Sequence, residues 1–319
     1  MTSIVGNAAA QAAFASALAE DSLHHAWLIA GPEGVGKGSF ARSAGARLVG
    51  GGTQRDDLIA ARAHPDFKVV EREVWGKTDT LVPYDERKEG DAPARSIRVA
   101  QVRWLRNELT TRPSLGERRA VIIDAVDDLE ASGANALLKS LEEPPLGTIF
   151  LLVSHAPGRL LPTIRSRCRL LRFGLLNDEE VATVVSREQS DLSPAELSAL
   201  VAAGEGAPGR ALRFAGLDVH GLDAAIAAIA GDGDVDNARR SALARSLAGK
   251  SASPRYEAFL ERVPAFIARE ARRRSGPTLA ATLDAHGRAR DLAGASLGMS
   301  LDPQATVWEM ARLLAGLPR

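Results

Sequence analysis

A glycine-rich loop places the strongest constraint on how this chain can fold. Residues 31–37 read Gly-Pro-Glu-Gly-Val-Gly-Lys and match the first seven positions of the phosphate-binding pattern G-x-x-x-x-G-K. In such a loop the glycines, here Gly31, Gly34 and Gly36, let consecutive backbone N–H groups turn toward phosphate oxygens. The helix that follows adds the positive end of its dipole, and Lys37 is expected to reach the outer phosphates. A glycine-rich turn without a ligand is the simpler alternative.

Two positions that handle metal and water in such sites carry unsuitable side chains here. The eighth position of the pattern is normally Ser or Thr, whose hydroxyl binds Mg²⁺. It is Gly38 in this chain, and Ser39 comes one residue too late. A later apolar run ends at Asp124, an arrangement in which the aspartate holds the metal. The next residue is usually Glu in enzymes that hydrolyse ATP, but here it is Ala125. We therefore predict a degraded metal site, unless Asp124 only caps a turn.

The first part of the chain alternates short apolar runs with helical patterns. This alternation is typical of a mostly parallel α/β sheet flanked by helices. Residues 64–95 contain three prolines and many charges, so we expect them to be irregular apart from one strand. Strands are predicted at 25–30, 67–70, 120–123, 148–153 and 170–173, and helices at 7–20, 38–48, 99–109 and 131–142, with Asn7 as the N-cap of the first.

Beyond residue 174 we find no strand candidate, and the chain reads as helices. Patterns at 181–185, 193–203 and 211–215 predict three short ones, with Ser193 as an N-cap. From 219 onward, helices rich in Ala, Leu and Arg are expected to break at Gly231–Gly233, Pro254, Pro264 and Pro277. We therefore predict an α/β domain over 1–173, a small helical domain over 174–218 and a helical domain over 219–319.

Composition excludes several classes of protein. The chain has 40 basic and 40 acidic residues, which argues against a highly basic nucleic-acid coat protein or a cationic membrane-surface protein. Cys168 is the single cysteine, so neither an internal disulfide nor a zinc site built from cysteines is possible. No apolar window approaches the roughly 18 residues of a membrane-spanning helix, and the first residues lack a signal-peptide pattern. A cytoplasmic location is therefore expected.

Four segments, in a fixed order, carry a resemblance to a known family. They are the strand and phosphate loop at 25–37, Ala-Asn-Ala-Leu-Leu-Lys-Ser-Leu-Glu-Glu-Pro-Pro at 134–145, Ser-Arg-Cys at 166–168 and Gly-Ala-Pro-Gly-Arg-Ala at 206–211. Together they resemble the clamp-loader subunits of bacterial DNA polymerase III, which belong to the AAA+ superfamily. The resemblance implies a P-loop AAA+ α/β domain, a small helical lid domain and an all-α C-terminal collar through which subunits assemble.

The resemblance also implies roles for two arginines. Arg167, in the Ser-Arg-Cys motif, would be an arginine finger that acts in trans on ATP bound to a neighbouring motor subunit. Membership of a surface arginine cluster is the alternative. Arg210 would face the chain's own phosphate loop or hold two domains together, with a surface ion pair as the alternative. Motor subunits usually carry four zinc-binding cysteines, which this chain lacks, so no zinc is expected.

As a whole the resemblance implies a subunit that helps to load the sliding clamp onto primed DNA without hydrolysing ATP itself. The implied partners are the motor subunits gamma and tau, the delta subunit, the sliding clamp and primer–template DNA, with no membrane. Binding of ATP or ADP to the degenerate loop stays open. Two alternatives remain: a motor subunit or other P-loop ATPase that hydrolyses ATP, and a structural binding module with no role at any ATP site.

Overall fold

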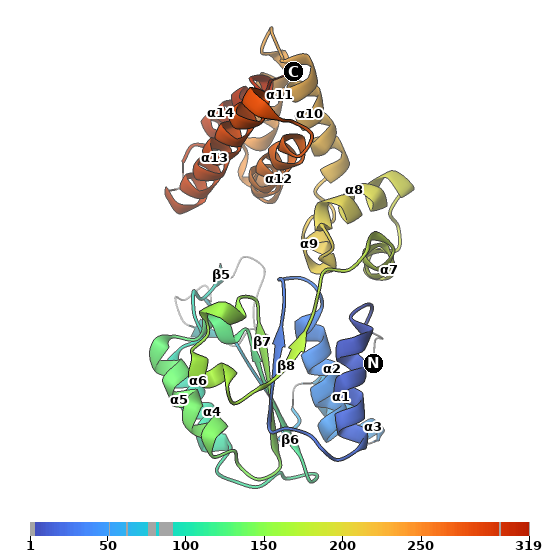
Figure 1. Cartoon of the computed structure of the whole chain (residues 1–319), viewed down its shortest axis with the longest axis vertical. Helices are drawn as coiled ribbons and strands as arrows, with labels where there is room; N and C mark the ends of the chain where they lie inside the picture. Colours follow the sequence, from blue (N-terminus) through green and yellow to red (C-terminus); the bar gives the residue numbers. More distant parts are fainter. Residues whose placement is uncertain are drawn as a thin grey trace. The chain divides into compact units, whose positions relative to one another are not determined.

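The computed structural model describes residues 4–50, 52–61, 63–75, 81–82, 92–299 and 301–318. The chain forms two compact units, Met1–Glu180 and Val181–Arg319. The first unit contains the strands, and the second is made of helices (Figure 1). The predicted division at residues 173 and 218 into three domains stays a prediction.

A five-stranded parallel sheet forms the centre of the first unit. Its order is β2-β6-β7-β1-β8, so β1 lies between β7 and the edge strand β8. The inner strands are buried throughout, which is why they read as continuous apolar runs in the sequence. All five predicted strands are confirmed: β1 (Ala26–Ala30), β2 (Phe67–Glu71), β6 (Arg119–Asp124), β7 (Thr148–Ser154) and β8 (Arg169–Arg172).

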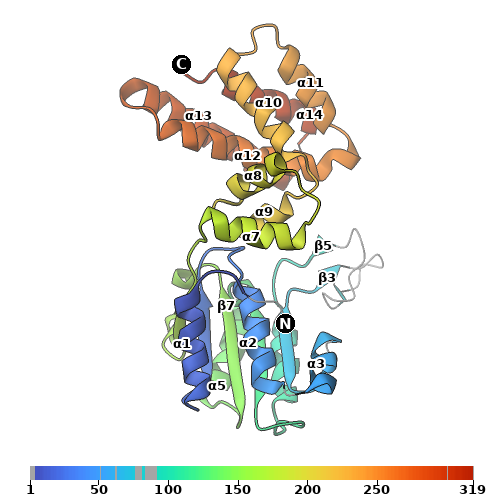
Figure 2. The ribbon, with the colours of Figure 1, turned by 90° about the vertical axis from the view of Figure 1, so that its right-hand side faces the viewer.

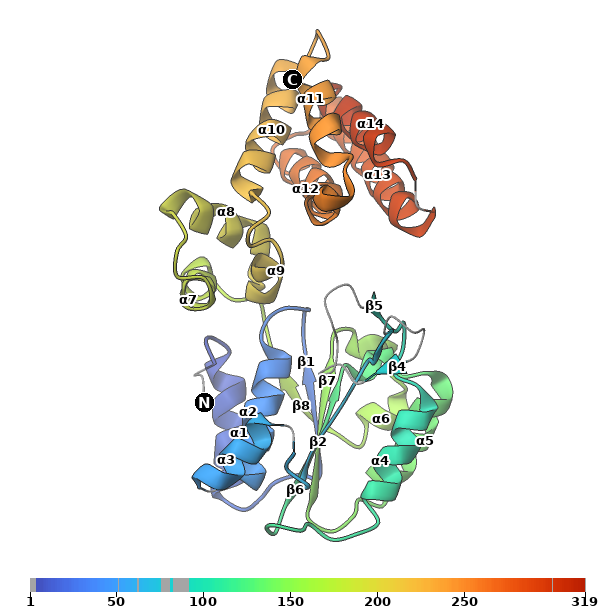
Figure 3. The same ribbon diagram turned by 180° about the vertical axis from the view of Figure 1, so that it is seen from behind.

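Helices cover both faces of this sheet, as the opposite views of Figures 1 and 3 show. On one face Phe14 packs edge-on against both Trp27 of β1 and Phe40. On the other, apolar side chains of the helices meet Leu28, Val121 and Leu152 of the strands. The first face carries α1 (Ala8–Ala19) and α2 (Lys37–Val49), with α3 (Thr53–Ala60) beside α2; the second carries α4 (Val99–Glu108), α5 (Ala131–Glu142) and the short α6 (Pro162–Arg165).

The structure adds elements that the sequence did not predict. Besides α3, the stretch 64–95 holds an antiparallel sheet of order β4-β3-β5, built from β3 (Val74–Trp75), β4 (Leu81–Val82) and β5 (Ala92–Pro93). Strands of two residues are too short to give a periodic signal. Residues 76–80 and 83–91 of this stretch lie outside the described residues. Short 3₁₀ turns among the described residues lie at Val126–Asp128, Pro157–Arg159 and Lys250–Ala252.

Asn7 is the N-cap residue of α1, as predicted, but its side chain makes no capping hydrogen bond. Its Oδ1 accepts a hydrogen bond from the Gly174 N–H at 2.7 Å, and its Nδ2 donates to the Gly174 carbonyl at 3.3 Å. The asparagine therefore ties the start of the chain to the segment that follows β8, instead of satisfying the first N–H groups of α1.

The second unit contains only helices among its described residues (Figure 2). Ser193 caps α8 as predicted, since its hydroxyl accepts from the Glu196 N–H. The predicted break at Pro264 was wrong: α12 runs through it, with Pro264 buried beside Val263. Within the described residues no helix has the length and apolar character needed to span a membrane. The helices are α7 (Asp178–Glu188), α8 (Pro194–Gly204), α9 (Pro208–Arg213), α10 (Val219–Asp232), α11 (Ala238–Leu247), α12 (Ser253–Ala271), α13 (Gly276–Met299) and α14 (Pro303–Ala315).

Candidate phosphate loop and arginine sites

The glycine-rich loop joins the carboxyl end of β1 to the first turn of α2, where a phosphate loop is expected. A Cβ on Gly31 would lie 2.0 Å from the Phe173 carbonyl oxygen, so only glycine fits between β1 and the end of β8. Gly34 and Gly36 have φ angles of +81° and +91°, which side chains rarely allow. The sequence folds into this loop because glycine stands at each of these positions.

Lys37 is the first residue of α2, and its side chain is folded back into the loop. Its residue is 2% exposed, and its Nζ donates a hydrogen bond to the Pro32 carbonyl. Burial lowers the pKa of Lys37 to about 8, although the carboxylates of Asp124, Asp127 and Glu33 act in the opposite direction. The ammonium is thus available for a phosphate but is held by the loop's own backbone.

This shift predicts a pH dependence of stability. The ordinary pKa of 10.5 falls to about 8 on folding, so the unfolded chain binds the Lys37 proton more tightly. Relative to a Lys37→Met variant, the free energy of unfolding should rise by about 3 kcal/mol as the pH increases from about 8 to 10.5, and stay level below 8. Urea unfolding of the unaltered chain and of the Lys37→Met variant across this pH range measures the change in the free energy of unfolding. A difference that does not change with pH would contradict the assignment.

An arginine of α2 pairs with Asp124, the residue that the sequence predicts to hold a metal. Arg42 lies one turn after Gly38 on α2, and its Nη1 donates to Asp124 Oδ2 at 2.7 Å. Its Nη2 donates to Glu71 Oε2 at 2.8 Å. Glu71 and Asp124 stand opposite each other at the carboxyl ends of β2 and β6. The guanidinium therefore supplies the positive charge between these carboxylates.

Gly38 belongs to the same arrangement. A Cβ at this position would meet Asp124 Oδ2 at 2.5 Å and Arg42 Nη1 at 3.1 Å, so a Ser or Thr would require the side chains of this ion pair to shift. The donor set does not fit Mg²⁺, because the hydroxyl is missing and the carboxylate oxygen is already bonded. In the described part of the chain, no group of three or more His, Cys, Asp or Glu side chains is placed to hold a metal ion.

Asp127, three residues after Asp124, accepts hydrogen bonds from the residues at the carboxyl end of β7. Its Oδ1 accepts from the Ser154 hydroxyl at 2.9 Å and from the Ala156 N–H at 3.2 Å, and its Oδ2 accepts from the His155 N–H. Ala125 is buried and has no group that could orient a water molecule. Asp124 and Asp127 are thus engaged within the protein, and neither offers a free base beside the loop.

Arg167 lies just after α6 and pairs with a residue of the Leu-Glu-Glu-Pro-Pro segment. Its Nη2 is 2.7 Å from Glu142 Oε1, and its Nη1 donates to the Thr163 carbonyl at 2.9 Å. About a third of the Arg167 side chain is exposed. Beside it, burial raises the pKa of the Cys168 thiol to about 12, so this cysteine is no nucleophile at neutral pH.

Arg210 lies in the second unit, in α9, and is held by two carboxylates. Its Nη1 is 2.6 Å from Glu205 Oε2 and its Nε is 2.7 Å from Glu261 Oε1. Glu261 belongs to α12, so Arg210 joins the helices after residue 180 to those after 219.

Within the first unit, the predicted residues Gly31, Gly34, Gly36, Lys37 and Asp124 come together at the carboxyl ends of the strands, whereas Arg167 pairs with Glu142. Arg210 belongs to the second unit, where Glu205 and Glu261 hold it. Sequence reasoning missed Arg42 and Glu71. The available signal was helical spacing: residues 38 and 42 are four apart and share one face of α2.

Comparison with known proteins identifies relatives for most of this chain. A family profile described as "DNA polymerase III, delta subunit" matches residues 6–177, more than half of the chain. The DNA polymerase III subunit delta' of Pseudomonas aeruginosa is 35% identical over 205 residues, which cover 61% of this chain and 57% of that one. The Escherichia coli subunit delta' is 35% identical over 155 residues, or 49% of this chain and 41% of that one. The E. coli subunit tau is 32% identical over 262 residues, or 81% of this chain and 38% of that one. The chain thus spans less than two thirds of the length of these relatives.

Proposed function

Because the chain belongs to the DNA polymerase III delta subunit family, we propose that it is a delta-prime-type subunit of a clamp loader that does not hydrolyse ATP. It would help to load the sliding clamp onto primed DNA within the DNA polymerase III holoenzyme. The observation that carries the proposal is the Arg42–Asp124 ion pair, because it takes the place of the metal that ATP hydrolysis in such a loop requires.

Arg167 is the residue through which this subunit would take part in ATP hydrolysis. We assign it to the ATP site of a neighbouring motor subunit, where a guanidinium would stabilise the charge that builds on the phosphoryl oxygens. Its pair with Glu142 is partly exposed, and such pairs contribute no more than about 1 kcal/mol. A triphosphate carries more charge than one carboxylate, so the guanidinium can exchange Glu142 for phosphate when a neighbour docks.

The proposed partners follow from the relatives. They are the gamma and tau subunits, the delta subunit, the sliding clamp and primer–template DNA. Residues 174–218 would form the lid and residues 219–319 the collar that joins the subunits, and the bonds of Arg210 to Glu205 and Glu261 would fix the lid to the collar. DNA contact in such an assembly can run through backbone N–H groups on phosphates, so a neutral net charge is no objection.

A motor subunit is the second candidate, since the E. coli tau subunit matches 81% of this chain. The two candidates differ in a simple assay. We expect the isolated chain to show no Mg²⁺-dependent ATP hydrolysis above that of a Lys37→Ala variant, and to co-elute with tau and delta in gel filtration. Brisk turnover that Lys37→Ala abolishes would favour the motor subunit, and failure to co-elute with any of these subunits would contradict membership of the complex.

A further inference from the structure

The segment between Glu143 and Asp178 contains five arginines and no acidic residue, although the net charge of the whole chain is zero. Arg167 is the one paired with Glu142. Among the described residues, the other four have no carboxylate partner; they are Arg159, Arg165, Arg169 and Arg172. Uncompensated cations concentrated on one segment of a neutral protein indicate an anionic partner.

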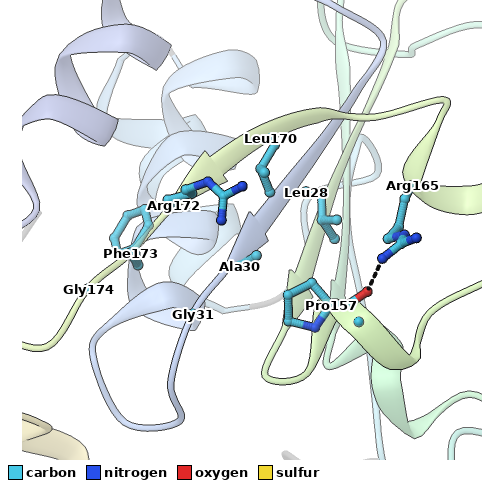
Figure 4. Close-up of a pocket in the computed structure, with 10 residues that line it drawn as sticks. Leu28, Ala30, Gly31, Pro157, Arg165, Leu170, Arg172, Phe173 and Gly174 are labelled. Carbon is cyan, nitrogen blue, oxygen red and sulfur yellow. Dashed lines mark hydrogen bonds between the residues drawn. The ribbon is translucent and has the colours of Figure 1, made fainter. Parts of the chain in front are cut away.

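Two of these arginines flank a pocket of about 510 Å³ beside the edge strand β8. Its apolar lining comes from neighbouring strands, because Leu28 of β1 stands opposite Leu170 of β8. Figure 4 shows Arg172 on one side of this pocket and Arg165 on the other, with Arg165 Nη1 donating to the Pro157 carbonyl at 3.4 Å. Both guanidinium groups are exposed. The pocket therefore combines an apolar floor with two cationic sides.

The pocket borders the phosphate loop at Gly31, which is part of its lining, but it lies on the other face of the sheet from Lys37. Leu28 belongs to the sheet face that packs against α4 and α5, whereas α2, which begins at Lys37, covers the opposite face. Leu170 of the lining is 42% exposed, and Leu175, next in the chain to the lining residue Gly174, is 60% exposed. Apolar side chains and unpaired cations at the uncovered edge of a sheet are the composition of a protein interface.

We propose that this pocket docks an acidic surface segment of another protein subunit, with one apolar side chain entering between Leu28 and Leu170 and carboxylates meeting Arg165 and Arg172. The proposal rests on the proposed function, since the subunit would be a partner in the same assembly. Arg165 and Arg172 would thus hold the neighbour in place, and Arg167 between them in sequence would act on its nucleotide.

Nucleic acid fits this surface less well. A phosphate backbone has no apolar group to fill the floor of the pocket, and a base needs an aromatic platform on which to stack. The aromatic residue in the lining, Phe173, is only 2% exposed. A protein segment with a carboxylate next to an apolar side chain would match both the cationic sides and the apolar floor of the pocket.

Charge reversal tests the proposal. We expect an Arg165→Glu/Arg172→Glu double variant to bind isolated tau or delta at least about tenfold more weakly than the unaltered chain, because like charges then face each other. Leu170→Gln should weaken the same interaction with less dependence on salt, since it removes apolar contact and no charge. Surface plasmon resonance at two salt concentrations gives both readings, and circular dichroism confirms that the variants fold.

The matched control is Arg47→Glu, which reverses an exposed arginine of α2 on the other face of the sheet and should leave the affinity unchanged. If the unaltered chain binds a subunit and the double variant binds it equally well, the docking proposal is wrong while the proposed function stands. If the double variant loses affinity for primed DNA and not for the subunits, the surface is a nucleic-acid site and the proposal is overturned. If the unaltered chain binds no subunit, the proposed function itself has failed.

Discussion

Replacing Arg167 with alanine is expected to slow ATP hydrolysis at the neighbouring subunit's site by about 10³-fold or more, without loss of assembly. An arginine that meets the γ-phosphate in the transition state lowers the barrier by about 4 kcal/mol or more. The measurement is ATP turnover by the reconstituted clamp loader in the presence of clamp and primed DNA. Pre-steady-state kinetics resolve the affected site from the other motor subunits, which continue to turn over.

Three further variants test whether Arg167 acts as an arginine finger or only through its positive charge. Arg167→Lys keeps the positive charge but loses the planar fork of donors, so most of the defect should remain. Glu142→Gln breaks the ion pair seen here and should change turnover no more than a few-fold, because the guanidinium exchanges this partner for phosphate. Arg47→Ala alters an exposed arginine of α2 and should have no effect. Full turnover by Arg167→Ala in an intact complex would eliminate the finger assignment.

The strands of the sheet could be predicted from the sequence because a strand buried on both faces leaves a local signal, a short run of apolar residues. β7 is buried throughout and β6 is buried up to Ile123, so the centre of each strand reads as an apolar run, and the glycines of the loop mark the junction of β1 with α2. The two-residue strands and the continuity of α12 through Pro264 were not predictable in this way. The helix continues because its neighbours on the buried face, such as Val263 and Ile267, keep it packed, and this stabilisation outweighs the cost of one proline.

The site was predictable only in part. Gly38 and Ala125 predict that metal and water are not handled in the usual way, but the sequence could not show that Arg42 pairs with Asp124. That depends on β2 lying beside β6, which brings Glu71 opposite Asp124, and on the reach of Arg42 from α2. Neither Arg42 nor Glu71 belongs to a motif, so only the pairing of distant strands reveals them.

Replacing Arg42 with alanine is expected to lower the free energy of unfolding by about 2–3 kcal/mol. Breaking a buried ion pair by removing one partner costs about 3–5 kcal/mol, and partial exposure reduces this value. The exposed fractions are 34% for the Arg42 side chain, 15% for Glu71 and 20% for Asp124. Urea unfolding measures the change. Arg47→Ala in the same helix is the control and should stay within about 0.5 kcal/mol of the unaltered chain.

The effect of Mg²⁺ on stability then tests whether the Arg42 guanidinium takes the place of a metal or only forms an ordinary ion pair. In Arg42→Ala the Asp124 carboxylate has lost its cation beside the loop, so Mg²⁺ should restore part of the lost stability through its preference for carboxylate oxygens. The unaltered chain should gain nothing from Mg²⁺, and Arg42→Lys, which keeps a positive charge, should gain less than Arg42→Ala. If Mg²⁺ together with ATP stabilised the unaltered chain strongly, the guanidinium would not be excluding the metal. The case for a subunit that cannot hydrolyse ATP would then lose the observation on which it rests.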